Sequence, residues 1–268
     1  MNLETITKQA IVLVKETAEY IQQQRHNIKD KNIETKGLHD YVTFVDKTSE
    51  QRLVDGLSKL LPGSGFITEE ETIANKQKEY TWIIDPLDGT TNYIHGIPVY
   101  SISVALRHNQ KTIAGIVYEI NQNECFYSWQ NAPVFLNDSE VAVTQTKTID
   151  QSLLATGFPY YDYQKLTPYL RHFAEILQKS RGVRRLGSAA VDLAYVACGR
   201  FDGFYEYSLH AWDVAAGAFL VQQAGGVVSD FKGENNFLFG GEILATNPDV
   251  FDDMLEHLKK YFVSNANS

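Results

Sequence analysis

Cysteine is scarce in this sequence: Cys125 and Cys198 are the only two among 268 residues. A framework of several disulfides and a thiolate metal site both need more cysteines than that, so we exclude both. Long apolar runs are also missing, since none reaches the roughly 20 residues that span a bilayer. The first residues lack the pattern of a signal peptide. We therefore expect a cytoplasmic protein without a membrane segment.

Positive charge is the second shortage. Lys and Arg number 24 against 33 Asp and Glu, which gives a net charge of −9 and an isoelectric point near 5.3. Proteins whose main partner is a nucleic-acid backbone are usually basic, so this charge argues against such a partner. A hydrophobic content of 44% and a charged content of 21% are typical of a soluble globular enzyme.

The chain length fits one large domain or two joined halves. We place a boundary near residue 145, between an N-terminal α+β half (1–145) and a C-terminal α/β half (146–268). Apolar residues at helical or alternating spacing define the expected elements. Helices are expected over about 1–26, 48–61, 167–179, 189–198, 214–224 and 248–261, and strands over about 65–68, 82–84, 101–106, 112–119, 124–129, 201–207, 227–229 and 243–245.

One run stands out among the residues that are present: 82–92, with the sequence WIIDPLDGTTN. Its aromatic and β-branched start is typical of a buried strand, and Asp85 and Asp88 follow directly. Pro86 has no backbone N–H, so we expect the chain to turn there. Gly89 allows close approach to a ligand, and the polar residues after it suit a helix start with free N–H groups. The run therefore suggests a place where metal ions and a phosphate meet.

A simpler interpretation of the same run is an ordinary turn with an Asp cap. A calcium loop is a further alternative, but the spacing of acids in an EF-hand is absent. The choice between these depends on the acids elsewhere in the chain.

Other acids also stand where strands end or helices begin. Glu69 and Glu70 follow a short strand, Asp213 opens a helix, and Asp46 precedes one. In layered α/β proteins such positions gather along one edge, where ligands bind. Several carboxylates there would repel one another unless cations neutralise them. Because all the donors are hard oxygens, the set favours Mg²⁺ or Mn²⁺ over zinc, and a site completed by a phosphate favours magnesium over calcium.

Together these motifs resemble the inositol monophosphatase family, and its bacterial members in particular. The resemblance is carried by residues 82–92, by Glu69-Glu70 and by the run 212–217 (WDVAAG), and is supported by the segments 40–46, 185–190 and 203–206. It covers roughly residues 5–260. The family belongs to a larger group of lithium-sensitive, magnesium-dependent phosphatases. It implies an α+β fold with αβαβα layers, of the inositol monophosphatase and fructose-1,6-bisphosphatase type, and a homodimer.

The resemblance also implies roles for individual residues. In the family pattern Glu69, Asp85 and the carbonyl of Leu87 hold one Mg²⁺, and Asp85, Asp88 and Asp213 hold a second. Glu69 serves a weaker third ion as well, and Mn²⁺ is an expected substitute.

The remaining catalytic roles follow from the same match. Glu70 supports the metal ligands through hydrogen bonds or metal-bound waters. Asp46 and Thr90 orient and deprotonate the attacking water, and the backbone N–H groups of Gly89 and Thr90 bind the phosphate. Hydrolysis is expected to be direct, without a phosphoenzyme.

Substrate-facing residues are implied as well: Gly187, Ser188, Ala189 and Glu206 should face the hydroxyl groups of the substrate. The role of Arg184 and Arg185 is left open. They could bind a second phosphate of the substrate, or they could lie in a dimer interface or form structural ion pairs. Lys36 matches a loop residue that approaches the metals.

The chain departs from the family pattern at two places. Thr68 stands where many members carry Gly, and the segment 71–80 is short. Because this loop borders the site, the family's size selectivity is not carried over to this chain.

The sequence thus predicts a Mg²⁺-dependent phosphomonoesterase of small polyol phosphates, with inositol 1-phosphate as the preferred substrate. A phosphatase of NADP(H), of nucleotide bisphosphates or of fructose bisphosphate, with the same site, is an alternative. A regulatory protein that binds RNA or the transcription machinery is an alternative of another class.

Overall fold

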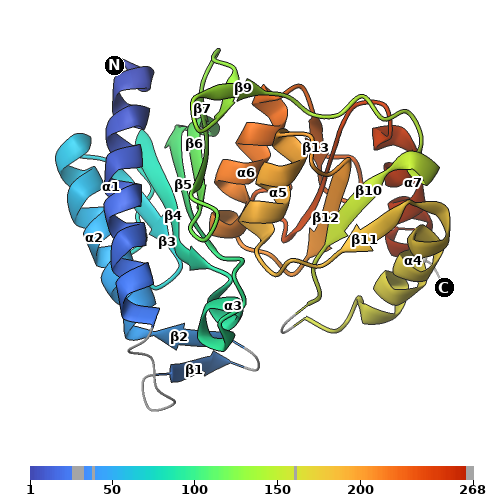
Figure 1. Ribbon diagram of the computed structural model, residues 1–268, viewed down its shortest axis with the longest axis horizontal. Coiled ribbons are helices and arrows are strands. Elements are labelled where there is room, and N and C mark those ends of the chain that lie inside the picture. The colour runs from blue at the N-terminus through green and yellow to red at the C-terminus, as the bar shows by residue number, and fades with distance from the viewer. Residues whose placement is uncertain (26–32, 38–39, 160–161, 264–268) are drawn as a thin grey trace.

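The computed structural model describes residues 1–25, 33–37, 40–159 and 162–263, with side chains left out for 33–37 and 40–42. Its helices and sheets form five layers (Figure 1). Helices α1 (Leu3–Gln24) and α2 (Phe44–Leu60) cover a seven-stranded sheet, and α5 (Ala189–Ala197) and α6 (Ala211–Gln223) fill the middle. A five-stranded sheet and the outer helices α4 (Leu166–Lys179) and α7 (Phe251–Phe262) follow. The predicted αβαβα architecture is confirmed.

The seven-stranded sheet keeps the chain order β3-β4-β5-β6-β7-β8-β9. β3 and β4 are parallel, and every later pair is antiparallel. The strands are β3 (Gly65–Thr68), β4 (Tyr80–Asp88), β5 (Ser101–His108), β6 (Lys111–Glu119), β7 (Glu124–Trp129), β8 (Val134–Leu136) and β9 (Ser139–Val141). In β4, Trp82 and Ile84 pack in the core under α1 and α2, while Ile83 packs in the core under α5 and α6. This alternation explains why the run is apolar throughout: both faces of the sheet are covered.

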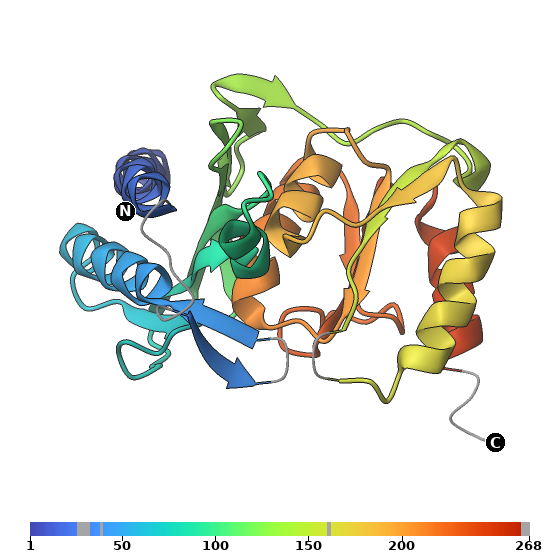
Figure 2. The same ribbon diagram turned by 60° about the horizontal axis from the view of Figure 1, so that its bottom comes forward.

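The five-stranded sheet has the order β11-β10-β12-β14-β13. Its strands are β10 (Leu153–Thr156), β11 (Gly182–Arg184), β12 (Gly203–Tyr207), β13 (Val227–Ser229) and β14 (Glu242–Thr246). In β12, Phe204 packs against the middle helices and Tyr205 packs under α4 and α7. Figure 2 shows the middle helices between the two sheets from another side. Both sheets therefore share one helical layer, and the division into halves at residue 145 stays a prediction.

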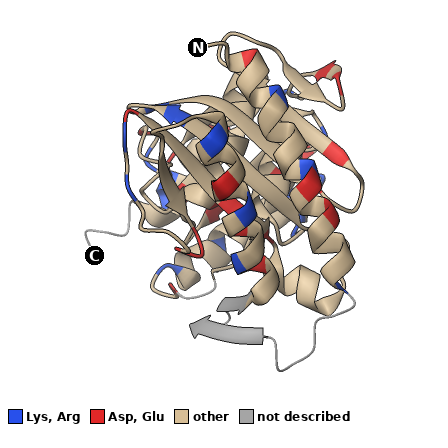
Figure 3. Cartoon of the chain, turned by 90° about the vertical axis from the view of Figure 1, so that its left-hand side faces the viewer, with Lys and Arg blue, Asp and Glu red and all other residues tan. Residues whose placement is uncertain are grey.

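Four short elements complete the described fold. Helix α3 (Thr90–His95) follows β4, and β1 (Ile33–Gly37) and β2 (Asp40–Thr43) form an antiparallel pair apart from the main sheets. A 3₁₀ turn, η3 (Ile149–Gln151), precedes β10. Within the described residues, no helix combines the length and the apolar character needed to cross a bilayer. On the face formed by α1 and α2, acidic and basic residues are interspersed (Figure 3).

Pro86 does not end its strand, which corrects one expectation. β4 continues to Asp88, and its pairing with β5 is irregular between Asp85 and Asp88. A bulge tolerates the missing N–H of a proline, because the residues within it do not pair regularly. The irregularity lies at the carboxylates themselves, so it determines how Asp85 and Asp88 project from the strand.

Asp46 lies inside its helix rather than before it, which corrects a second expectation. Thr43 caps α2 by accepting a hydrogen bond from the Val45 N–H at 3.1 Å, and Asp46 accepts from the Thr43 N–H at 2.9 Å. This capping box starts α2 at Phe44, ahead of the expected residue 48. The helix therefore fixes the backbone of Asp46.

Candidate active site

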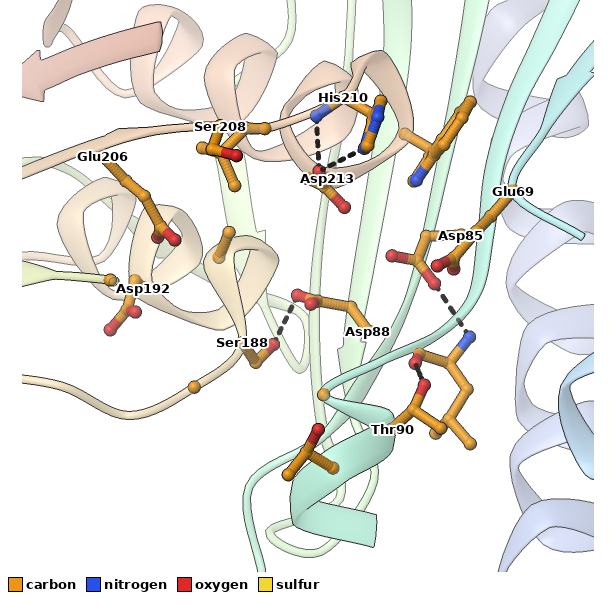
Figure 4. Close-up of a pocket in the computed structure, with 18 of the residues that line it drawn as sticks. Glu69, Asp85, Asp88, Thr90, Ser188, Asp192, Glu206, Ser208, His210 and Asp213 are labelled. Carbon is orange, nitrogen blue, oxygen red and sulfur yellow. Dashed lines mark hydrogen bonds and ion pairs between the residues drawn. The ribbon is translucent and has the colours of Figure 1, made fainter. Parts of the chain in front are cut away.

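One cavity collects the ends of elements from both sheets (Figure 4). It has a volume of about 280 Å³, and it lies where β3, β4 and β12 end and where α3, α5 and α6 begin. The predicted site residues that line it are Glu69, Asp85, Leu87, Asp88, Gly89, Thr90, Gly187, Ser188, Ala189, Glu206 and Asp213. Asp46 and Glu70 are not among the lining residues.

Three carboxylates come together at the centre of this cavity. Asp85, Asp88 and Asp213 each offer an oxygen within 4.8 Å of the others. Asp85 is 1% exposed, and the Leu87 N–H donates to its Oδ1 at 2.9 Å. Burial raises the pKa of Asp85 well above its usual value, and the charges of Glu69, Asp88 and Asp213 raise it further. A divalent cation would relieve this repulsion, so the donor set fits a hard metal ion.

Asp88 is held by the start of α5. The Ser188 hydroxyl donates to Asp88 Oδ2 at 2.6 Å, and the Ala190 N–H donates to the same oxygen at 2.8 Å. Burial raises the pKa of Asp88 to about 6, although these two hydrogen bonds and the charge of Arg185 lower it. Ser188 lines the cavity, and its hydroxyl positions a candidate metal ligand; its expected contact with the substrate stays a prediction.

Asp213 is positioned by the residue before its own helix. It is the third residue of α6, and it accepts a hydrogen bond from the His210 N–H at 2.6 Å. The ring Nδ1 of His210 lies 3.8 Å from the same carboxylate oxygen, and the ring stacks on Trp212. His210 and Trp212 both line the cavity and were not predicted as site residues.

Asp46 and Thr90 are joined as the sequence predicted. The Thr90 hydroxyl lies 3.0 Å from Asp46 Oδ1 and 2.9 Å from the Leu87 carbonyl oxygen. The other carboxylate oxygen of Asp46 accepts from the Thr43 hydroxyl at 2.6 Å. Burial raises the pKa of Asp46, and the hydrogen bonds from Thr43 and Thr90 lower it in part. Asp46, which does not line the cavity, is therefore hydrogen-bonded to a residue that does.

Glu50 is a residue that the sequence reasoning missed. It lies on α2 with no exposed surface, and its carboxylate accepts from the Glu70 N–H at 2.7 Å and the Thr72 N–H at 2.8 Å. These bonds anchor the loop that carries Glu69. A signal existed, because Glu50 occupies an apolar position of α2 beside Leu53 and Val54. An acid at such a position is rarely buried without a partner.

The side of the cavity away from Glu69 holds the predicted Glu206 and the unpredicted Asp192 (Figure 4). Arg185, whose role the sequence left open, also lines the cavity. Burial raises the pKa of Glu206 well above its usual value, the charge of Arg185 lowers it, and Asp213 and Asp88 raise it. A Cβ atom added to Gly157 would lie 2.0 Å from the Glu206 carboxyl group, so this side chain rests directly on the Gly157 backbone.

The two neighbouring arginines, Arg184 and Arg185, have different surroundings in the structure. Arg185 lines the cavity, whereas Arg184 is exposed on β11, the edge strand of its sheet. The side chain of Lys36 lies outside the described residues, so its predicted approach to the metals stays a prediction.

The chain is similar to known proteins in sequence and in structure. A family model described as inositol monophosphatase family matches residues 2–262. The Nus factor SuhB of Escherichia coli is 40% identical over 242 residues, which cover 87% of this chain and 91% of that protein. The crystal structure of extragenic suppressor protein suhB from Bartonella henselae matches with a TM-score of 0.90 at 33% identity, covering 96% of this chain and 99% of that one. The structure of inositol monophosphatase from Anabaena matches with a TM-score of 0.86 at 33% identity, covering 97% and 98%.

Proposed function

The chain belongs to the inositol monophosphatase family, and on this premise we propose that it is a Mg²⁺-dependent phosphomonoesterase of small polyol phosphates, with inositol 1-phosphate as the preferred substrate. The observation that carries the proposal is the meeting of Asp85, Asp88 and Asp213 within 4.8 Å in a cavity that Glu69 also lines. Hard oxygen donors of this number and charge suit Mg²⁺, and Mn²⁺ would suit the same donors.

The metal ligands divide into two sets that share Asp85. Glu69, Asp85 and the Leu87 carbonyl would hold one ion, and Asp85, Asp88 and Asp213 a second, with Glu69 also serving a third. When bound, such ions lower the pKa of a bound water from ~15.7 towards neutrality and stabilise the leaving oxygen. Glu70 would support the first set from the loop that Glu50 anchors.

Asp46 and Thr90 would position the attacking water. Asp46 is buried, and its hydrogen bond to the Thr90 hydroxyl fixes that hydroxyl at the edge of the cavity. Thr90 can then accept a proton from the water while Asp46 takes one from Thr90, a form of general base catalysis. The backbone N–H groups of Gly89 and Thr90 would bind the phosphate.

Phosphate release tests this proposal. The wild-type protein with Mg²⁺ is assayed against inositol 1-phosphate, fructose bisphosphate, adenosine bisphosphate and NADP, and EDTA should abolish the activity. The highest kcat/KM should fall on inositol 1-phosphate. A preference for NADP or for a bisphosphate would instead identify the protein as a phosphatase of that substrate, with the same catalytic site.

Substitution of the proposed metal ligands gives a sharper test. Asp85→Asn and Asp213→Asn should lose nearly all turnover, because each removes a charged ligand from the cluster, while their circular dichroism matches the wild type. Asp252→Asn, at an exposed position of α7, is the matched control and should keep full activity. Full activity of either cluster variant at saturating Mg²⁺ would rule out the metal assignment.

A second function is favoured by one finding: the similar Escherichia coli protein is named a Nus factor. We therefore also propose binding to the transcription machinery or to RNA as a function beside hydrolysis. A pull-down and a gel-shift assay with the wild type and Asp85→Asn would separate the two. Binding retained by the inactive variant would show that the partner uses another surface, and absence of binding in both would reject this second function.

We propose a homodimer as well. Helix α4 exposes Leu170 and Leu177 at 50% and 47% of their surfaces, and β11 beside it is the edge strand of its sheet, so no strand among the described residues pairs with its outer side. A twofold contact would cover both features at once. Arg184, exposed on β11, would lie in that contact.

A further inference from the structure

Asp192 is a buried acid that the catalytic scheme does not use. It lies in the first turn of α5, it lines the cavity, and it is 1% exposed. Within the described part of the chain, no hydrogen-bond donor reaches its Oδ1 atom. A buried carboxylate oxygen without a donor lowers stability, so the protein bears an unfavourable group at the wall of its substrate cavity. Such a group is typical of a position that a ligand completes.

Asp192 lies in the first turn of α5, where an acid is favoured, but it stands among apolar residues. Its neighbours on α5, Val191 and Leu193, are fully buried apolar residues of the core. An apolar or neutral side chain of similar size would fit there without the penalty of a buried charge. Burial raises the pKa of Asp192 well above its usual value, and Glu206 and Asp88 raise it further, while Arg185 lowers it.

Glu206 faces the same end of the cavity from the other side. It comes from β12, it is 6% exposed, and its carboxyl group is fixed against the Gly157 backbone. Figure 4 shows Asp192 and Glu206 together on the side of the cavity away from Glu69. The phosphate would lie at the metal cluster, so this pair would meet the alcohol part of the substrate.

We propose that Asp192 acts with Glu206 as a paired acceptor for neighbouring hydroxyl groups of the leaving alcohol, which makes Asp192 a specificity-determining residue for polyol monophosphates. Ionised carboxylates only accept hydrogen bonds, and hydroxyl groups donate them. Two neighbouring acceptors suit a molecule with two adjacent donors, such as a ring polyol. This inference rests on the proposed phosphatase function.

The same pair disfavours a second phosphate. Arg185 supplies one positive charge at this end of the cavity against the two acids. A further phosphate would enter a largely buried place that holds two carboxyl groups against one arginine, and any negative charge on these carboxyl groups would repel it. The geometry therefore selects a neutral polyol over a bisphosphate.

The test compares Asp192→Asn with wild type on two substrates, inositol 1-phosphate and phenyl phosphate, which has no hydroxyl group on its alcohol part. The ratio of their kcat/KM values should fall about tenfold in Asp192→Asn, mainly through KM for inositol 1-phosphate, because the contact forms before the chemical step. Analogues of inositol 1-phosphate that each lack one hydroxyl group give a second comparison. Asp192→Asn should lower kcat/KM least for the analogue that lacks the hydroxyl group bound by Asp192. Asp252→Asn should leave the ratio unchanged.

A structural role of Asp192 would give a different result. Asp192→Asn should unfold at the same or a higher temperature than wild type in metal-free buffer, since it removes a buried charge beside other carboxylates. An equal fall of kcat/KM for both substrates, or a lower unfolding temperature, would overturn the proposal.

Binding of free myo-inositol separates this inference from the proposed function. Millimolar myo-inositol should raise the unfolding temperature of the metal-free wild type and raise it less in Asp192→Asn. If the wild type hydrolyses neither phosphate ester, the proposed function fails, and the shift with myo-inositol still decides the role of Asp192. No shift in the wild type would overturn the inference, whatever the assay of hydrolysis shows.

Discussion

Each acid of the central cluster has its orientation set by a hydrogen bond from the protein. The donors for Asp85 and Asp213 are backbone N–H groups, of Leu87 and His210, two or three positions away in the chain. The donors for Asp88 come instead from α5, a hundred positions away. Because the side chains are fixed before any ligand arrives, the site requires little rearrangement to bind a metal.

Thr90 should be needed for rate and not for metal binding. Thr90→Ala removes the hydroxyl that Asp46 holds, so kcat should fall by roughly 10²–10⁴-fold, the usual range for a lost general base. Stabilisation of the fold by Mg²⁺, followed as the rise in unfolding temperature, should persist. Thr90→Ser keeps the hydroxyl and should retain most of the activity. An unchanged kcat in Thr90→Ala would reject the proposed pair.

Sequence reasoning worked best for residues whose partners are local. Residues 82–92 contain the end of a strand, two acids and the start of a helix. Because these features are adjacent in the sequence, they must also be close in space. Glu50 and Asp192 were missed because their surroundings form only when distant elements pack. Glu50 contacts the loop after β3, and Asp192 lines the cavity together with Glu206. Both stand at apolar positions of helices, and that mismatch is the signal such residues leave.

Elements meet closely where the two middle helices cross. A Cβ atom added to Gly217 of α6 would lie 2.5 Å from the Cβ atom of Leu193 on α5. Only glycine therefore permits this separation of α5 and α6. Since α5 carries Ser188 at its start and α6 carries Asp213, the crossing also sets the distance between two sides of the site.

Gly217→Ala should destabilise the protein in spite of the higher helix propensity of alanine. We expect a loss of about 1–3 kcal/mol, the usual cost of overpacking, measured by urea unfolding. Gly56→Ala in α2 is the matched control, because its added Cβ would meet only the flexible end of Leu13 at 2.8 Å. The control should be neutral or stabilising by up to about 1 kcal/mol. Equal effects of the two substitutions would contradict the close crossing.

The contact of α4 with the outer face of its sheet and α7 should make stability depend on pH. His172 of α4 is fully buried against Tyr205, His257, Tyr261 and Phe262, and burial lowers its pKa to about 3. The unfolded chain protonates His172 near pH 6.5, so its contribution to stability is complete above that pH and is lost as the pH falls towards 3.

His172→Phe should flatten this dependence. Between pH 6.5 and 5 the wild type should lose up to about 1.4 kcal/mol per pH unit through His172, and the variant should lose less. His257, whose pKa burial also lowers, stays in both proteins together with Glu175, Lys179 and Lys260, so the difference reports His172 alone. Parallel pH curves from urea unfolding would contradict the assignment.

Some short strands were missed, although β3 and β13, which are equally short, were predicted. β10 and β11 have four and three residues, too few for a pattern of alternation, and neither was expected. Longer strands such as β5 and β6 were predicted because eight or nine residues carry a clear apolar signal. Pro86 was misjudged because a bulge, which depends on the neighbouring strand, accommodated it.

At the scale of the whole molecule, the two outer helical faces differ in the side chains that they expose. The helix α4 exposes leucines, whereas the α1–α2 face carries mixed charge (Figure 3). Exposed leucines in a row are a feature of contact surfaces.

A dimer through α4 should dissociate when that row is made charged. The wild type should elute at twice the 30.3 kDa mass of the chain in size-exclusion chromatography with light scattering. Leu177→Glu should shift it towards the monomer, and Val12→Glu, an exposed apolar position on α1, should not. A monomeric wild type, or a dimeric Leu177→Glu, would reject this contact.

The middle layer of helices has a consequence for synthesis. Asp85 and Asp88 emerge from the ribosome early, whereas Ser188, which holds Asp88, follows 100 positions after Asp88, and Asp213 follows later still. Until α5 and α6 have docked, the nascent chain carries an incomplete set of acids that lacks its third member. The complete set of acids therefore forms only near the end of translation, and we expect a truncated product to lack both the proposed metal binding and the proposed activity.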